Sequence, residues 1–197
     1  MIILASASPR RQELLQQIGC EFRVVVSDVE EAAGQSMTPE KLVLHNACLK
    51  ASAVARNLVG QSVLGADTVV SLDGRIYGKP KDAEEAKEML CRLSGREHQV
   101  STGVALVRDG AVWQAVETTS VRFLPLSTVQ MEAYIATGEP MDKAGAYAIQ
   151  GRAAIFIQGI TGSYSNVVGL PLSCVAQLAG KAGINLYGDN GKGFTSG

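Results

Sequence analysis

The sequence predicts an α/β fold in which a mixed sheet is flanked by helices. Apolar runs of strand length alternate along most of the chain with segments that have helical periodicity and recognisable helix ends. Two long strand-like segments, in contrast, are joined across Asp109-Gly110, a dipeptide typical of a tight hairpin. The alternation favours parallel pairing and the hairpin adds an antiparallel pair, so the sheet is expected to be mixed.

The helices begin and end at residues suited to those places. Ser8 and Pro9 suit the cap and the first position of the first helix, and Gly19 suits the position after its end. Ser127 and Gln130 match a capping box. Strands are expected at 2–5, 22–26, 62–70, 98–107, 112–123 and 153–158. Helices are expected at 9–18, 38–58, 82–95, 127–137 and about 171–182.

The chain is long enough to build one substantial hydrophobic core. It has 197 residues, and neither an internal repeat nor a low-complexity linker divides it. We therefore expect residues 1–186 to form a single bilobed domain whose loops converge on a cleft. The last residues, 187–197, are rich in Gly and lack periodicity, which predicts a flexible C-terminal tail.

Composition excludes several classes of function. A net charge of -1 argues against sequence-independent binding of nucleic acid, which normally requires a basic excess. No apolar run approaches the length of a membrane span, and the apolar N-terminus is too short for a signal peptide, so a cytoplasmic protein is expected. The four cysteines are too far apart for a paired zinc or redox motif.

An unusual pair of cations, Arg10 and Arg11, lies in the first turn of the first predicted helix. Helix starts favour acidic residues, because the unpaired N–H groups and the macrodipole are positive there. Two guanidinium groups beside those N–H groups favour a polyanion such as a phosphate chain. The alternative is a solvated basic turn in which the arginines pair with nearby carboxylates.

Asp67 is the second anomaly, because it lies within an otherwise apolar strand segment. A carboxylate there is costly to bury without a cation or hydrogen-bond donors, and strand ends of α/β sheets are where ligand crevices form. The alternative is an Asp that caps its own turn. Glu30 and Glu31 form a second acidic cluster, although adjacent acids in a loop are usually only solvated.

The charged residues together form an inventory suited to phosphoryl transfer. Lys50 lies in a helix otherwise rich in Ala and Leu, and Lys79 precedes a rigid Pro. Phosphoryl transfer requires cations around the phosphates, carboxylates that hold a divalent ion, and a base that orients water. No Walker A or G-x-G-x-x-G motif is present. Gln150, between Ile149 and Gly151, offers an amide suited to the edge of a base.

Histidine chemistry is poorly supported. The chain has two histidines, and neither His45 nor His98 has a visible partner for a nucleophilic triad or a zinc site. The segment 162–166 also lacks the G-x-S-x-G pattern of a nucleophile elbow.

Taken together in order, the motifs resemble the Maf family of nucleoside triphosphate pyrophosphatases, over essentially the whole chain up to about residue 186. The motifs that carry the resemblance are Ser6-Ala7-Ser8-Pro9-Arg10-Arg11, Gly65-Ala66-Asp67-Thr68, Gly78-Lys79-Pro80, Ser94-Gly95-Arg96-Glu97-His98, Asp142-Lys143-Ala144-Gly145-Ala146-Tyr147, Gln150-Gly151, Gly162-Ser163-Tyr164 and Gly169-Leu170-Pro171. The segment from Asp142 to Gly151 is similar to that of the branch that hydrolyses dTTP and UTP.

The resemblance implies a fold similar to the inosine triphosphate pyrophosphatases, with two lobes around a nucleotide cleft, and a homodimer. It also implies hydrolysis of a nucleoside triphosphate to the monophosphate and pyrophosphate with a divalent cation, Mg²⁺ or Mn²⁺. By position, Asp67 matches the proton acceptor and, with Glu31, the metal-linked acids. The substrate positions are specificity residues Arg11, Thr68 and Gln150 and phosphate-binding residues Ser8, Arg10, Lys50 and Lys79.

Two other functions remain open at this stage. A nucleotide-binding regulator linked to cell division would use the same cleft without turnover, although such a binder gains little from acids that face phosphates. A housecleaning enzyme would differ only in preferring 5-modified pyrimidine nucleotides. The chain departs from the family pattern at His45, where a basic residue is often found.

Overall fold

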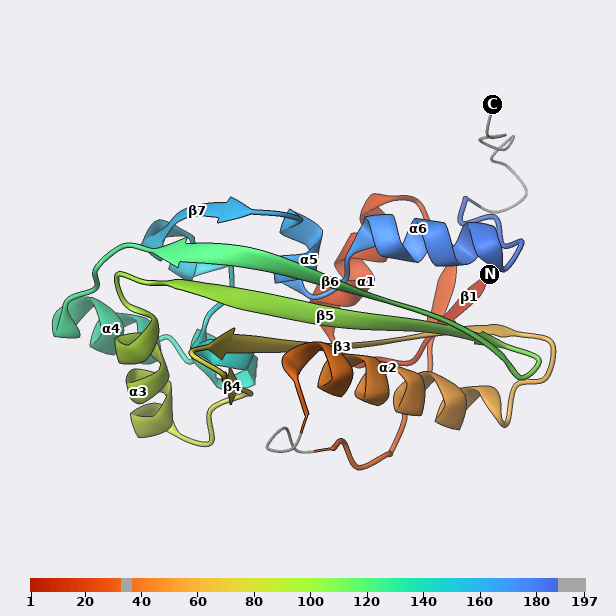
Figure 1. Ribbon diagram of the computed structural model, residues 1–197, viewed down its shortest axis with the longest axis horizontal. Helices are drawn as coiled ribbons and strands as arrows, with labels where there is room; N and C mark the ends of the chain where they lie inside the picture. The colour runs from red at the N-terminus through yellow and green to blue at the C-terminus, as the bar shows by residue number, and fades with distance from the viewer. Residues whose placement is uncertain (33–36, 188–197) are drawn as a thin grey trace.

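The computed structural model describes residues 1–32 and 37–187. Within these residues the chain forms a seven-stranded sheet with the order β2-β1-β3-β5-β6-β7, and β4 pairs with β3 off that path (Figure 1). The strands are β1 (Ile2–Leu4), β2 (Phe22–Val24), β3 (Ser62–Leu72), β4 (Arg75–Tyr77), β5 (Glu97–Arg108), β6 (Ala111–Phe123) and β7 (Ile157–Thr161).

The sheet is mixed, as the sequence predicts. β1 is parallel to both β2 and β3, whereas the β3–β4, β3–β5, β5–β6 and β6–β7 pairs are antiparallel. The predicted hairpin joins β5 to β6 through Asp109, which has a positive φ of 48°, and Gly110. Such left-handed backbone is why Asp-Gly is favoured in this kind of turn.

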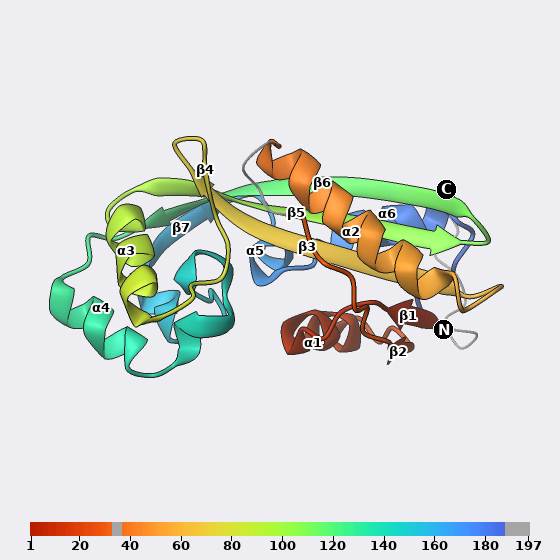
Figure 2. The same ribbon diagram turned by 90° about the horizontal axis from the view of Figure 1, so that it is seen from below.

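Helices cover both faces of the sheet. The helices are α1 (Pro9–Gln17), α2 (Pro39–Ala55), α3 (Ala83–Leu93), α4 (Thr128–Ile135), α5 (Tyr164–Val168) and α6 (Leu172–Lys181). Side chains alternate between the faces of a strand. Val63 of β3 accordingly packs in a cluster with α2, whereas its neighbour Leu64 packs with α1 and α6. Figure 2 shows α2 crossing in front of β3 on the face of the sheet that is turned towards the viewer.

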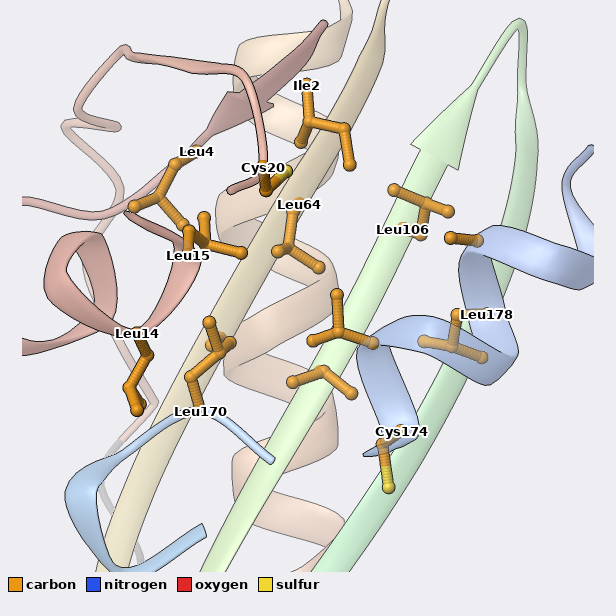
Figure 3. Close-up of a cluster of buried hydrophobic side chains, with 14 of the residues drawn as sticks. Ile2, Leu4, Leu14, Leu15, Cys20, Leu64, Leu106, Leu170, Cys174 and Leu178 are labelled. Atoms are coloured by element: carbon orange, nitrogen blue, oxygen red, sulfur yellow. The ribbon is translucent and has the colours of Figure 1, made fainter. Parts of the chain in front are cut away.

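Two of the apolar clusters form cores towards opposite ends of the long strands β3, β5 and β6, and the parts of the molecule built around these two cores are termed lobes. One core lies between β1, α1, α6 and the adjoining ends of β3 and β5, and includes Leu15, Leu64 and Leu178 (Figure 3). The other lies among α3, α4 and the segment around Tyr147 and Phe156. The lobes are therefore joined by continuous strands.

The prediction of a strand at 153–158 is wrong in its position. Residues Arg152–Phe156 form a 3-10 helix, and β7 follows it. Ala153 and Phe156 are both buried in the second core, and their spacing of three residues matches the turn of a 3-10 helix. Burial of these two side chains on the same side thus selects the helical turn.

Two short elements lie where the sequence predicts only loops. β4 extends the β3 edge after the Asp73-Gly74 turn, and α5 lies in the Gly- and Ser-rich segment. Ser163 caps α5, since its hydroxyl accepts a hydrogen bond from the Asn166 N–H. Among the described residues, no helix combines the length and the apolar character that crossing a membrane requires.

His98 is buried in the second core, although its sequence neighbours are exposed. Its Nε2 lies 2.8 Å from the Tyr147 hydroxyl, and its ring packs edge-on against Phe123. Burial lowers the pKa of His98 to about 4, from 6.5 for an unperturbed imidazole. The neutral ring is therefore the form that the folded protein accommodates.

We expect this histidine to make the protein less stable in acid. Below pH 6.5 the unfolded chain binds the proton more readily than the folded protein, so stability is lost as the pH falls towards 4. Linkage gives about 2 kcal/mol less stability at pH 5 than at pH 7. Urea unfolding at both pH values should show this loss in the wild type and in His45→Gln, an exposed-histidine control, but not in His98→Phe.

Candidate functional site

A cleft of about 1300 Å³ lies between the two lobes. It is lined by residues of α1, α2, β3 and β4 and of the segments that follow β1, β2, β4 and α4. All nine residues that the sequence singled out line this cleft: Ser8, Arg10, Arg11, Glu31, Lys50, Asp67, Thr68, Lys79 and Gln150. Its volume is ample for a nucleoside triphosphate.

The cleft follows one edge of β3, at a place where that strand changes partners. β1 pairs with residues 62–64 of β3, and β4 pairs with residues 70–72. Among the described residues, no strand pairs with the segment 65–69 on this edge. Asp67 and Thr68 lie in that unpaired segment. No neighbouring strand in the described part of the chain covers this edge beside them, so both residues are accessible from the cleft.

Asp67 is held by two side chains of α2. Its Oδ1 lies 2.9 Å from Lys50 Nζ, and its Oδ2 accepts a hydrogen bond of 3.1 Å from Asn46 Nδ2. The carboxylate is 7% exposed, and the Lys50 side chain is almost as deeply buried. Asp67 is therefore a buried carboxylate that is paired with a cation, which is the condition its burial requires.

Two glycines allow α2 to approach the sheet closely enough for these contacts. A Cβ at Gly65 would lie 2.3 Å from the carbonyl oxygen of Ala47, and one at Gly103, which pairs with Asp67 across β3 and β5, would lie 2.5 Å from Val43. Any side chain at either position would push α2 away from β3.

Glu31 reaches the same lysine from the loop after β2. Its Oε1 lies 2.9 Å from Lys50 Nζ, and its side chain is 51% exposed. Lys50 thus lies between two carboxylates, one buried and one accessible. Within residues 1–32 and 37–187, no group of three or more potential ligand side chains gathers to form a metal cage.

The two carboxylates nevertheless suit a hard divalent cation. Mg²⁺ is commonly held by one or two carboxylates while substrate phosphates and water supply the other ligands. Glu31 and Asp67 provide two oxygen donors that converge on the Lys50 ammonium, in the cleft itself. The donor set fits Mg²⁺ or Mn²⁺ that arrives with a phosphate chain.

The structure places the two arginines in different environments, which their position at a helix start alone does not distinguish. Arg10 lies 3.5 Å from Asp142 of the other lobe, in an ion pair accessible to solvent. Arg11 is buried and donates to the Gly169 carbonyl oxygen at 2.8 Å and to the Thr68 hydroxyl at 3.1 Å. The expectation of two free guanidinium groups therefore does not hold for Arg11.

Arg11 joins α1 to β3 and to the segment before α6. Its Nη1 donates to the Ser6 hydroxyl and to the Ala66 carbonyl oxygen, at 3.0 and 2.9 Å. Burial lowers the pKa of Arg11, an effect that the negative charges of Asp67 and Glu31 oppose. Because its hydrogen-bond acceptors are neutral oxygens, Arg11 forms no direct ion pair, and it contributes a positive potential to the cleft that the nearby charges of Asp67 and Glu31 partly offset.

The remaining predicted residues lie around the rim. Ser8 occupies the N-cap position of α1, but its side chain makes no capping hydrogen bond, contrary to the expectation from sequence. Lys79 is exposed, and the loop that carries it is tied to the segment after α4, because the Gly145 N–H donates to the Gly78 carbonyl oxygen at 3.0 Å.

Gln150 is exposed at the rim and follows a tightly held turn. The Glu139 carboxylate accepts a hydrogen bond from the Arg152 N–H at 3.1 Å and another from the Tyr134 hydroxyl at 2.9 Å. A Cβ at Gly151 would lie 2.1 Å from that carboxylate. Glu139 therefore fixes the turn that presents Gln150 to the cleft.

Sequence reasoning missed Asn46 and Glu139. Asn46 lies four residues before Lys50, and residues with that spacing share a face of a helix, so a link to Asp67 was accessible from the sequence. Glu139 gave no comparable signal, since its contact with residue 152 depends on how the intervening segment folds.

Comparison with known proteins identifies the family of the chain. A family model described as Maf-like protein matches residues 1–182. A relative from Symbiobacterium thermophilum, named dTTP/UTP pyrophosphatase, is 55% identical over 186 residues, 94% of this chain and 96% of its own. Another of that name, from Bacillus cytotoxicus, is 54% identical over 171 residues, 87% of this chain and 90% of its own.

A solved structure described as the Staphylococcus aureus Ham1 protein has the same fold. It gives a TM-score of 0.53 at 19% identity and covers 91% of this chain and 98% of that one. At this identity the likeness concerns the fold alone, and it confirms the predicted mixed sheet flanked by helices. The family match over residues 1–182, together with relatives of more than 50% identity along most of the chain, shows that the protein belongs to the Maf family.

Proposed function

We propose that the protein hydrolyses dTTP and UTP to the monophosphate and pyrophosphate. The observation that carries the proposal is the buried Asp67 carboxylate, held 2.9 Å from Lys50 at the floor of a cleft that cations line from both lobes. Relatives named dTTP/UTP pyrophosphatase, 55% and 54% identical to this chain, support the choice of substrates.

In this mechanism Asp67 is the general base. A carboxylate has about four lone-pair sites, and Lys50 and Asn46 each occupy one, so a water can donate to another. As the water oxygen bonds to the α-phosphorus, Asp67 takes its proton. The bond from the α-phosphorus to the bridging oxygen breaks, and pyrophosphate leaves in line with the attack.

Cations around the phosphate chain stabilise the charge that develops. Arg10 from α1, Lys50 from α2 and Lys79 from the loop after β4 all line the cleft. Glu31 and Asp67 would hold Mg²⁺ or Mn²⁺ together with the phosphates. When bound, such an ion neutralises phosphate oxygens and favours departure of pyrophosphate.

Recognition of the pyrimidine ring of the substrate is assigned to Gln150, at the rim of the cleft. The Gln150 amide can donate to a pyrimidine carbonyl and accept from the ring imide N–H, which fits thymine and uracil but mismatches cytosine. Thr68, oriented by Arg11, lies in the same cleft. Acceptance of both dTTP and UTP follows if the 2′ position and the 5-methyl group are not contacted.

The test is the release of pyrophosphate and of phosphate from dTTP, UTP, CTP, GTP and 7-methyl-GTP, with Mg²⁺ or Mn²⁺. We expect pyrophosphate from dTTP and UTP, with at least tenfold less from CTP and GTP, since one mismatched hydrogen-bonding edge costs at least this much. Turnover of 7-methyl-GTP instead would overturn the assignment of Gln150. Tight binding without turnover would indicate a regulator.

We extend the proposal to the organisation of the protein. Residues 1–186 form a single bilobed domain, in keeping with the family match to 1–182 and with the shared long strands. A homodimer remains a prediction from the family resemblance, and a cytoplasmic location and activity on 5-modified pyrimidine nucleotides also remain predictions. Most of the predicted flexible tail, 188–197, lies outside the described residues.

A further inference from the structure

Asn46 is a buried polar residue to which the sequence motifs give no role and which the proposed mechanism uses only as a partner of Asp67. It lies on the face of α2 that packs against β3 and is 2% exposed. Its amide makes three hydrogen bonds, all to groups at the cleft. A buried amide with this many partners costs little to keep in place and fixes the groups it touches.

The contacts of Asn46 join the two acids of the site. Its Oδ1 accepts from the Ala32 N–H at 2.9 Å, and its Nδ2 lies 3.4 Å from the Ala32 carbonyl oxygen. The same Nδ2 donates to Asp67 Oδ2 at 3.1 Å. Glu31 immediately precedes Ala32, so one side chain fixes the loop that carries one acid and the carboxylate of the other.

The short side-chain amide of Asn46 supplies both the acceptor that the Ala32 N–H requires and the donor that the Asp67 carboxylate requires. These two requirements assign the orientation of the amide. An aspartate at position 46 has no donor for Asp67 and brings a second negative charge towards it. A leucine of similar size has neither donor nor acceptor.

We propose that Asn46 is a positioning residue. It orients the Asp67 carboxylate for its reaction with water and holds the loop that carries Glu31 beside that carboxylate. Lys50 neutralises Oδ1 of Asp67, whereas Asn46 occupies one side of Oδ2 and so directs the remaining lone pairs into the cleft. This inference rests on the proposed function, because it assigns Asp67 as the base.

The kinetic test compares Asn46→Leu with Asn57→Asp, a control at an exposed position just after α2. We expect Asn46→Leu to lower kcat for dTTP about 10- to 100-fold, because a misplaced reacting group costs up to this much. Affinity for a dTTP analogue with a non-hydrolysable α–β bridge should change less than about threefold, since Asn46 does not touch the phosphates in this scheme. The control should match the wild type in both.

A double variant separates positioning from a general structural role. If Asn46 acts through Asp67, adding Asn46→Leu to the Asp67→Asn enzyme should lower its residual rate less than about twofold, because the carboxylate to be positioned is already gone. Equal losses in the two backgrounds would overturn the proposal. So would an Asn46→Leu enzyme that retains wild-type kcat.

A measurement without turnover keeps this result distinct from the proposed function. The side-chain amide of Asn46 should give a slowly exchanging NMR signal that moves in Asp67→Asn but not in Asp73→Asn, a variant of an exposed turn residue. An unmoved signal would overturn the positioning role. If the signal moves in Asp67→Asn but the wild-type protein releases no pyrophosphate, only the proposed substrate chemistry is overturned.

Discussion

Replacing Asp67 by asparagine is expected to lower pyrophosphate release from dTTP about a thousandfold, the typical contribution of a positioned general base. Asparagine keeps the shape of the side chain but cannot take a proton from water. Asp67 also pairs with Lys50, so the substitution removes a charged hydrogen bond. Single-turnover kinetics with saturating dTTP measure the loss in the chemical step.

The same variant should remain folded and should still bind nucleotide. Lys50 keeps Glu31 as a partner at 2.9 Å, so the loss of stability is about 1.5–3 kcal/mol, the value of a hydrogen bond to a charged group. Asp73→Asn is the matched control, because it makes the same chemical change at an exposed turn with φ 51°, which asparagine tolerates. Full activity of Asp67→Asn would exclude the mechanism.

Much of the candidate site could be predicted from the sequence because its residues violate local rules. Cations at a helix start and a carboxylate in an apolar strand are costly locally, and such costs are tolerated at functional sites. The structure places Arg10, Arg11 and Asp67 in one cleft, as that reasoning requires. What local rules could not provide is the difference between Arg10 and Arg11, since α1 turns their side chains to an exposed and a buried environment.

The contacts that hold Asp67 depend on a packing distance that no local pattern encodes. Asn46 and Lys50 reach it because Gly65 and Gly103 let α2 lie close to the sheet. Each glycine is unremarkable in a strand until the helix that crosses it is known. The error at 153–158 has a similar origin. The composition of this segment suits a strand, but burial of Phe156 in the second core favours the 3-10 helix that the structure shows.

Lys50→Met is expected to have the largest effect on stability. The substitution keeps an unbranched side chain of similar length but removes the cation that lies 2.9 Å from both Asp67 and Glu31. Removing one partner of a buried ion pair typically costs about 3–5 kcal/mol, because the other charge is left buried. Because Glu31 is half exposed, Asp67 carries most of this cost, and urea unfolding at pH 7 measures it.

Lys87→Met is the control, since its partner Glu132 is exposed and an ion pair at the surface contributes little to stability. The double variant Lys50→Met, Asp67→Asn then identifies the cause. If the cost arises from the unpaired carboxylate, removing its charge should restore about half or more of the lost stability, although each single substitution destabilises. Additive losses would instead mean that the lysine stem stabilises α2 through packing alone, and that the charge of Asp67 is tolerated without Lys50.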